Sequence, residues 1–366
     1  MACDLNPGPL SRRRGELFLK MPIAIDAMGG DFAPQSAVEG AFRAATEDGC
    51  SILLVGDRAR IEPELKKLGG DGGRIEVVHA EEVVGMDEPA ITPIRRKRRS
   101  SLRLCAELVQ EGRAQAMVTA GNTGAAMAVG KMVIGTVPGV DRPALAAVLP
   151  NPKGHTVLLD VGANVDSKPI HLRDFAVMGH FYAQEVLGTP SPRVGLLSVG
   201  EEESKGSELT REAFKLIKTA GLHFAGNVEG RNLFDGSVDV LVCDGFAGNV
   251  VLKSAESLAE FMIRKMREEI EASGRGKVGY LFARPVFERF RRMTDYREYG
   301  GAPLLGLNGG CLIGHGRSNA HAIQNAVRRA VEFSGARLDR KIRDKIAELR
   351  SQEERLLNGR QEAGAG

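Results

Sequence analysis

The residues best suited to chemistry lie in the glycine-rich segment Thr119-Ala-Gly-Asn-Thr-Gly-Ala-Ala126. An apolar run at 116–119 predicts a buried strand, and small residues after the glycines predict a helix. A glycine turn that leads into a helix leaves backbone N–H groups unpaired beside the positive end of the helix dipole, which suits an anion such as phosphate. Asn122 and Thr123 add polar side chains there. The alternative is a tight turn with nothing bound.

The same order of residues recurs at four other places, in which an apolar run is followed by a polar residue and then by glycine. These segments are 23–31, 157–166, 194–206 and 238–249. In an open parallel sheet the loops after the strands lie along one crevice, so we expect these loops to converge. The 119–126 segment is neither a P-loop nor a G-x-G-x-x-G fingerprint, so dinucleotide binding is not its first interpretation.

Acidic residues begin several of these loops. They are suited to Mg²⁺, but capping a helix is their commoner use. His315 lies between two glycines, and a single histidine of this kind is either structural or catalytic. The acidic residues in question are Asp26, Asp31, Asp160, Asp166 and Asp244.

A basic run precedes another predicted helix, in Arg95-Arg-Lys-Arg-Arg-Ser-Ser101. A charge run usually forms a solvated face, although its position at a helix start also permits contact with an anion. The hydroxyls of Ser100 and Ser101 are good helix caps and equally good phosphate contacts.

Composition narrows the class of protein. The chain has 366 residues, a net charge of +3 and no tryptophan, so neither charge nor aromatic content indicates nucleic-acid binding. The five cysteines are scattered without C-x-x-C spacing, which suits a reducing cytosol and argues against disulfides or a zinc site. No apolar run is long enough to predict a transmembrane helix.

The alternation of strand and helix patterns predicts one α/β domain with a mostly parallel sheet over residues 21–335. We expect residues 1–20 to form a disordered extension, and 336–366 to form a charged helix with a frayed tail. Within the domain, residues 255–296 predict a basic amphipathic helical hairpin. Such a hairpin suits an anionic membrane surface, and a dimer interface or an ordinary core helix explains the pattern as well.

Six segments of the chain form a recognisable set. They are Met28-Gly-Gly-Asp31, Ala120-Gly-Asn-Thr-Gly124, Asp160-Val-Gly-Ala-Asn-Val-Asp166, Gly200-Glu-Glu-Glu-Ser-Lys-Gly206, Asp244-Gly-Phe-Ala-Gly-Asn-Val250 and Tyr299-Gly-Gly-Ala-Pro-Leu-Leu-Gly306. Together they resemble the phosphate acyltransferases of bacterial phospholipid synthesis, the PlsX family, and the resemblance covers residues 22–333 in order. Two features depart from the family pattern: Arg99 stands where an acidic or small residue is expected, and the first twenty residues lie outside it.

The resemblance implies that a long-chain fatty acyl group passes from acyl carrier protein to inorganic phosphate. The fold implied is a Rossmann-like three-layer α/β/α fold, related to phosphotransacetylases and isocitrate dehydrogenases. The family works as a cytoplasmic homodimer that contacts anionic membranes peripherally, and its product passes to a glycerol-3-phosphate acyltransferase. No cofactor is implied; Mg²⁺ is conceivable but not predicted, and no nucleic-acid partner is expected.

The chemistry needs no activated serine or cysteine, because phosphate is already an anionic nucleophile. Catalysis then consists of placing phosphate beside the thioester and stabilising the oxyanion. We expect the 121–124 loop and Lys205 to hold phosphate, and Asn164, Asn249 or His315 to donate to the oxyanion or protonate the leaving thiolate. The acidic residues Asp160, Asp166 and Asp244 would orient these donors. The other predicted contacts are Asp26, Gly29, Gly30, Ser100, Ser101, Gly121, Asn122, Thr123, Gly124, Gly162 and Gly245.

Three other functions fit parts of the sequence. A soluble phosphotransacetylase that uses short-chain acyl-CoA would share the fold and the phosphate chemistry. A nicotinamide-dependent dehydrogenase lacks the expected acidic signature after a G-x-G-x-x-G turn. A membrane scaffold would depend on the basic hairpin alone.

Overall fold

The computed structural model describes residues 21–70, 73–294 and 300–364, and only the backbone for 276, 289–294 and 356–364. The extension predicted for 1–20 and the end of the predicted hairpin at 295–296 lie outside this part of the chain. The described strands form one eleven-stranded sheet in the order β3-β2-β1-β4-β11-β10-β5-β6-β9-β7-β8. Their bounds are β1 (Ile23–Asp26), β2 (Ile52–Gly56), β3 (Ile75–His79), β4 (Ala116–Thr119), β5 (Ala144–Asn151), β6 (Gly154–Leu159), β7 (Val194–Leu197), β8 (Phe224–Val228), β9 (Val240–Val242), β10 (Ala302–Leu305) and β11 (Gly310–Ile313).

The sheet consists of two parallel halves. Strands β1, β2, β3, β4 and β11 pair in parallel in one half, and β6, β7, β8 and β9 do so in the other. Between them, β10 and β5 are antiparallel to their neighbours. The predicted, mostly parallel sheet is therefore confirmed. The pairs β11–β10, β10–β5 and β5–β6 are all antiparallel, so the strands of the two halves run in opposite directions. The loops that follow the strands of the two halves therefore leave from opposite edges of the sheet, where the strands end.

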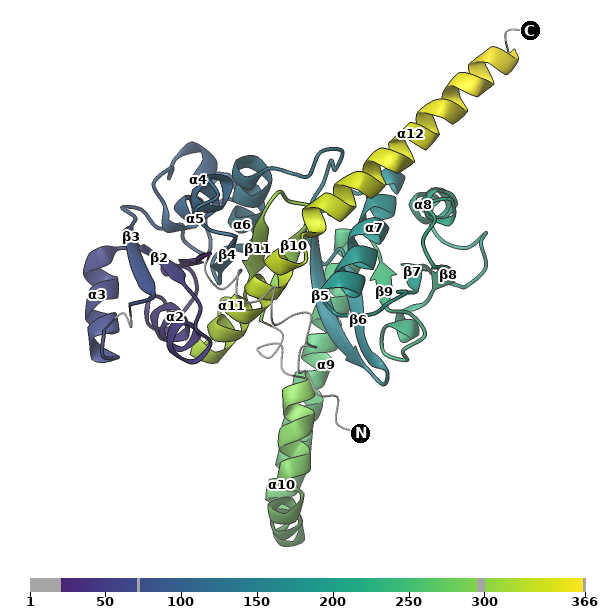
Figure 1. Cartoon of the computed structure of the whole chain (residues 1–366). Helices are drawn as coiled ribbons and strands as arrows, with labels where there is room; N and C mark the ends of the chain where they lie inside the picture. Colours follow the sequence, from purple (N-terminus) through teal and green to yellow (C-terminus); the bar gives the residue numbers. More distant parts are fainter. Residues whose placement is uncertain (1–20, 71–72, 295–299, 365–366) are drawn as a thin grey trace.

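Helices cover both faces of the sheet (Figure 1). Alternate residues of a strand point to opposite faces, and in β1 Ala24 joins one core cluster while Ile23 and Ile25 join another. In β6, Leu158 and Leu159 are divided between faces in the same way. This arrangement confirms the three-layer α/β/α fold.

One face carries α5 (Ser101–Gln110), α6 (Thr123–Val129) with its continuation η1 (Gly130–Ile134), and the start of α9 (Gly245–Ala272). The opposite face carries two groups of helices with separate core clusters. Those helices are α2 (Gln35–Glu47), α3 (Arg58–Lys67) and α11 (Ala320–Gly335) in the first half, and α7 (Pro169–Glu185), α8 (Glu208–Lys218) and α12 (Leu338–Gly364) in the second.

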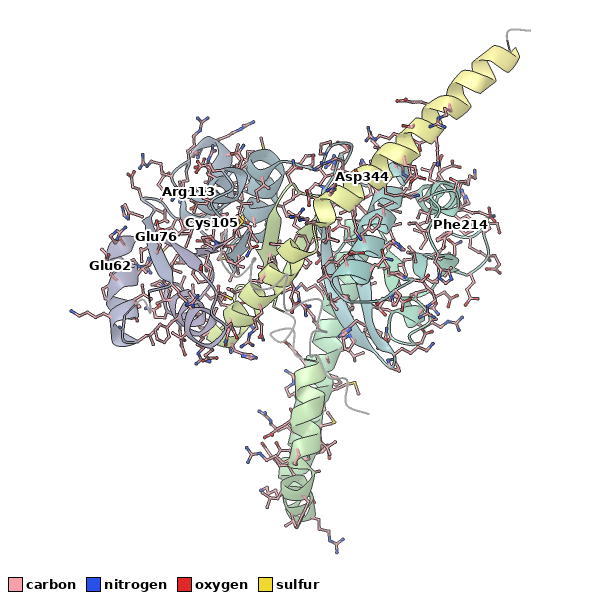
Figure 2. The ribbon with its side chains drawn as sticks, in the orientation of Figure 1. Glu62, Glu76, Cys105, Arg113, Phe214 and Asp344 are labelled. Atoms are coloured by element: carbon pink, nitrogen blue, oxygen red, sulfur yellow. The ribbon has the colours of Figure 1, made fainter. Side chains whose placement is uncertain are left out.

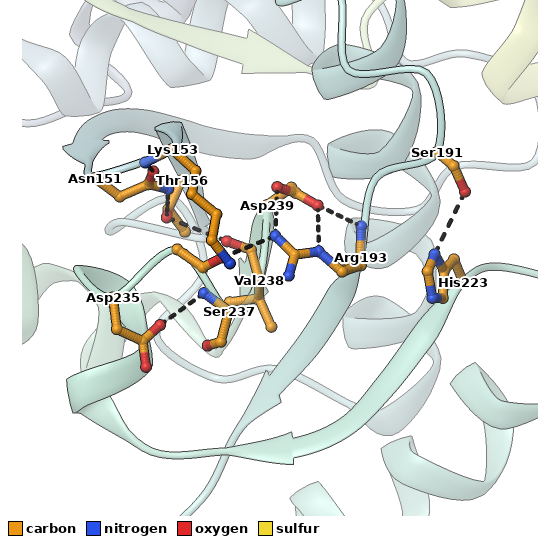
Figure 3. A network of polar contacts seen from close by, with 11 residues as sticks. Asn151, Lys153, Thr156, Ser191, Arg193, His223, Asp235, Ser237, Val238 and Asp239 are labelled. Atoms are coloured by element: carbon orange, nitrogen blue, oxygen red, sulfur yellow. Dashed lines mark hydrogen bonds and ion pairs between the residues drawn. The ribbon is translucent and has the colours of Figure 1, made fainter.

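Arg193 and Asp239 fix the strand starts in the second half (Figure 3). The Arg193 guanidinium donates to both carboxylate oxygens of Asp239 at 3.0 Å, and its Nη2 also donates to the Gly236 carbonyl at 2.9 Å. The Arg193 backbone N–H donates to the same carboxylate at 2.8 Å. These contacts precede β7 and β9, at the edge opposite the loops that follow those strands.

A helical hairpin protrudes from the body, formed by the outer part of α9 and by α10 (Gly274–Thr294) (Figure 1). Figure 2 shows side chains projecting to both sides of its outer part, clear of the rest of the molecule. The sequence pattern placed the start of the hairpin at Ala255, but α9 begins at Gly245 and its first residues pack against the sheet. Among the described helices, none is long and apolar enough to cross a membrane.

Candidate active site

The loops after β1 and β4 are joined through the buried carboxylate of Asp26. Its Oδ2 accepts a hydrogen bond from the Thr119 hydroxyl at 2.8 Å, and its Oδ1 accepts one from the Met28 N–H at 3.1 Å. The Thr119 hydroxyl oxygen in turn accepts the Gly121 N–H at 3.0 Å. Burial raises the pKa of Asp26, although hydrogen bonds from Ser101 and Thr119 oppose the shift. Asp26 therefore holds the glycine loop after β4 in place through Thr119.

Glycines allow these loops to touch. A Cβ on Gly29 would lie 2.8 Å from the Gly121 nitrogen, which is closer than real Cβ contacts come. Gly30 has a φ of +100°, a conformation that favours glycine. The Asp31 N–H donates to the Gly316 carbonyl at 2.8 Å, so the loop after β11 joins the same cluster. Three loops of the first half thus converge. This was predicted for the loops after β1 and β4, whereas the loop after β11 was not among the segments expected to converge.

A second cluster surrounds Asp160, in the other half. Its Oδ1 accepts N–H groups from Leu145 and Ala163 at 3.0 Å, and its Oδ2 accepts the Asn164 N–H at 2.7 Å. The side-chain amide of Asn164 donates to this carboxylate at 2.9 Å and to the Pro143 carbonyl at 2.8 Å. Burial raises the pKa of Asp160 against these bonds. Both amide hydrogens of Asn164 are therefore engaged within the protein.

The start of α9 is fixed to this second cluster. Asp244 caps the helix by accepting the Ala247 N–H at 2.9 Å. The Gly245 N–H donates to the Asn164 carbonyl at 2.9 Å. At Gly248 a Cβ would lie only 1.8 Å from the Asp160 carbonyl oxygen, so only glycine permits this approach.

The two clusters do not form the single rim that the sequence suggested, because the antiparallel strands β10 and β5 separate them. One pocket of about 510 Å³ nevertheless reaches both. Its lining combines polar loops with apolar residues of β5 and α9. The polar end includes Asp31, Gly121, Thr123, His315 and Arg317; the second cluster contributes Val161 and Asn249; and the apolar wall includes Leu145, Ala147, Leu149, Leu252, Ala255 and Ala259.

Four predicted site residues line this pocket: Gly121, Thr123, Asn249 and His315. The other predicted residues lie in the supporting loops or away from the pocket. They are Asp26, Gly29, Gly30, Ser100, Ser101, Asn122, Gly124, Asp160, Gly162, Asn164, Asp166, Lys205, Asp244 and Gly245.

The two serines are buried at the start of α5. The Ser100 hydroxyl donates to the Lys97 carbonyl at 2.7 Å, and the Ser101 hydroxyl bonds to Asp26. Ser100 makes no side-chain cap. In this structure the hydroxyls therefore support the loops and do not reach the pocket.

Lys205 lies in the loop after β7. Strand β7 lies next to β9 in the second half of the sheet. The Asn227 side chain donates to the Glu202 carbonyl at 2.8 Å and holds this loop in place. Lys205 is exposed and is not among the residues that line the pocket.

The acidic residues at the loop starts are used for hydrogen bonds in at least three cases, at Asp26, Asp160 and Asp244. Within the described ranges, no group of three or more metal-ligating side chains is found. That the protein needs no cofactor and no Mg²⁺ stays a prediction.

The architecture places the protein in a structural class. It is similar to a phosphotransacetylase from Streptococcus pyogenes, with a TM-score of 0.62, 17% identity, and coverage of 91% of this chain and 99% of that chain. A EutD phosphotransacetylase from Staphylococcus aureus gives a TM-score of 0.56 at 16% identity, covering 88% and 98%. At such identities the likeness shows the fold alone, which is that of phosphotransacetylases.

Sequence relatives then define the family. A family model described as fatty acid synthesis protein matches residues 21–340. A phosphate acyltransferase of Pelobacter propionicus is 53% identical over 90% of this chain and 95% of its own length. One from Geobacter sulfurreducens is 51% identical over 89% and 94%. This chain belongs to the phosphate acyltransferase family, and it is an acyltransferase that uses phosphate.

Proposed function

We propose that this protein transfers a long-chain fatty acyl group from acyl carrier protein to inorganic phosphate, and that the acyl phosphate serves phosphatidic acid synthesis. The observation that carries the proposal is the pocket, which joins a polar end made of glycine loops to an apolar wall between β5 and α9. An anion and an acyl chain need these two environments side by side.

The polar end suits phosphate. Among the described residues, the backbone N–H groups of Asn122, Thr123 and Gly124 form no hydrogen bond, and Thr123 lines the pocket. Arg317, which is exposed and also lines the pocket, adds a positive charge. Preorganised N–H groups and a cation favour a bound anion and the oxyanion of the transition state. Asn249 is our candidate donor to that oxyanion.

The apolar wall suits a long chain. From Asn249 to Ala259, α9 runs beside the pocket for ten steps along the helix, or about 15 Å at a rise of 1.5 Å per residue. Alternate residues of β5, including Leu145 and Leu149, face α9 on the other side of the pocket. We call this apolar part of the pocket, between β5 and α9, the groove. An acetyl group would leave most of the groove empty. This favours the long-chain donor over the short-chain acyl-CoA of a soluble phosphotransacetylase.

The donor is tested by measuring phosphate-dependent release of the carrier thiol from long-chain acyl carrier protein and from acetyl-CoA. We expect the carrier protein to be preferred, and Ala255→Phe to reduce its use because the ring fills the groove. Ala272→Phe is the control, since Ala272 is exposed at the end of α9. A preference for acetyl-CoA, or equal effects of the two variants, would contradict the proposal.

Lys205 and the orienting carboxylates keep the roles that we predicted as part of this proposal. For Lys205 to approach phosphate, its exposed loop would have to move and break the hydrogen bond from the Asn227 side chain to the Glu202 carbonyl. Replacing Lys205 with Met should raise the apparent KM for phosphate much more than the KM for the acyl donor. Equal effects on the two constants would remove Lys205 from the phosphate site.

The hairpin supports the further proposals of a homodimer and of peripheral contact with anionic membranes in the cytoplasm, where a glycerol-3-phosphate acyltransferase would take the product. Large apolar side chains are exposed along it, at Leu258, Phe261, Met262, Leu281 and Phe282. We expect Phe261→Glu to shift the oligomeric state in light scattering, and Phe282→Glu to reduce flotation with anionic liposomes. If the molar mass from light scattering and the flotation with liposomes are both unchanged, the hairpin mediates neither dimerisation nor membrane contact.

A further inference from the structure

Asn122 was expected to hold phosphate through its side chain, but that side chain is occupied. Its Oδ1 accepts the Ala125 N–H at 2.9 Å and so caps α6. Its Nδ2 lies 2.8 Å from the carbonyl oxygens of Met86 and Glu88 and 3.3 Å from that of Gly85. An amide group has only two hydrogens to donate. The Asn122 amide is therefore fully engaged by the backbone of a distant turn.

This turn, residues 85–88, is held from its other side as well. One carboxylate oxygen of Glu88 accepts the Gly85 N–H at 3.1 Å and pairs with the Lys97 ammonium group. Lys97 also donates to the Val83 carbonyl at 2.6 Å. Asn122 and the Glu88–Lys97 pair together define the position of a turn that has no regular secondary structure.

The turn closes the polar end of the pocket. The Met86 side chain lines the pocket, and its Cε lies 3.0 Å from the position that a Cβ on Gly316 would occupy. Met86 thus extends from the turn to the loop after β11. Ala90, just beyond the turn, contacts Gly124 in the same manner at 3.2 Å. The turn bridges the two loops that present the polar groups.

We propose that Asn122 is a positioning residue. Its amide holds the 85–88 turn as a roof over the phosphate end and fixes the backbone of residues 122–124 so that their N–H groups face the pocket. The inference rests on the proposed function, because it assigns phosphate to this end. Asn122 then acts on phosphate through the roof and the loop, and its own side chain makes no contact with the substrate.

The test is Asn122→Ser, in which a hydroxyl can still cap α6 but cannot reach the three carbonyls. Loss of these hydrogen bonds should raise the KM for phosphate by about tenfold and change the KM for the acyl donor much less. The control is Asn308→Ser, because the Asn308 amide donates to the Thr136 carbonyl at 2.9 Å outside the pocket lining. An unchanged phosphate KM, or equal changes for the two substrates, would overturn the assignment.

A double-mutant cycle separates positioning from direct contact. Glu88→Ala loosens the same turn from its other side and should also raise the phosphate KM. If Asn122 acts through the turn, the double variant will be little worse than the worse single variant; a direct ligand of phosphate would give additive effects. Additivity would overturn the proposal. Absence of phosphate-dependent activity in the unaltered protein would instead reject the proposed function.

Discussion

At the scale of single residues, the polar side chains that the sequence singled out mostly support the site from behind. Asp26, Asp160 and Asn164 are buried and their polar atoms are used by neighbouring loops. The sequence predicted where polar groups would gather, because polar residues and glycines follow apolar runs. It could not predict which polar atoms stay available, because that depends on contacts between segments distant in the chain, such as Asn122 with Met86.

The Arg193–Asp239 pair leads to a prediction about pH. Burial raises the pKa of Asp239, but hydrogen bonds and charge from Arg193 outweigh it and leave the pKa below 3.8. A lowered pKa stabilises the folded state above that pH, and the gain is lost as the pH falls through the folded-state value. Asp239→Asn should therefore reduce the free energy of unfolding by about 2 kcal/mol at neutral pH.

Urea unfolding at several pH values measures this effect, and the difference from the unaltered protein should shrink below pH 3.8. Glu212→Gln is the matched control, because the Glu212–Lys215 pair is exposed and such pairs contribute about 0–1 kcal/mol. A difference that stays constant into acid would show that the charge of Asp239 is not responsible.

At the scale of elements, the strand–loop–helix order could be read from the sequence, and the loops after β1 and β4 converge as expected. The loop after β11 joins them without having been predicted to do so. The sequence did not reveal the apolar wall. The side chains of β5 alternate between the two faces of the sheet in the same way whether Leu145 faces a core or a groove. The amphipathic pattern after Ala255 drew attention away from the true start of α9 at Gly245. The antiparallel β10 also had no distinct signal, so the separation of the two loop clusters was not anticipated.

The close approach of α9 to the loop after β6 gives a prediction for this element. Gly248→Ala would place a methyl group against the Asp160 carbonyl oxygen, so the start of α9 must move and the groove must change shape. We expect the free energy of unfolding to fall by about 2 kcal/mol and acyl transfer to fall with it. Thermal unfolding and the thiol-release assay measure the two effects.

Gly279→Ala in α10 is the control, since nothing lies within 4 Å of its added Cβ. Alanine is the better helix former by about 1 kcal/mol, so this variant should be neutral or slightly more stable. Equal behaviour of the two variants would contradict the tight contact at Gly248.

At the scale of the whole molecule, two half-sheets joined by antiparallel strands hold polar loops at opposite edges, and α9 with β5 forms the groove between them. Membership of the phosphate acyltransferase family supports phosphate as the acyl acceptor. The apolar groove offers a reason why the transferred acyl group would be long, as we propose. The part of α9 that lines the groove continues into the protruding hairpin, so the proposed membrane contact would bring the acyl chain close to the membrane.

The most direct measurement is a crystal structure with inorganic phosphate and a thioether analogue of a long-chain acyl phosphopantetheine. The account predicts phosphate against the backbone of Thr123 and Gly124 beneath Met86, and the acyl chain between Leu149 and Leu252. Phosphate bound elsewhere, or an acyl chain lying outside the space between β5 and α9, would contradict it.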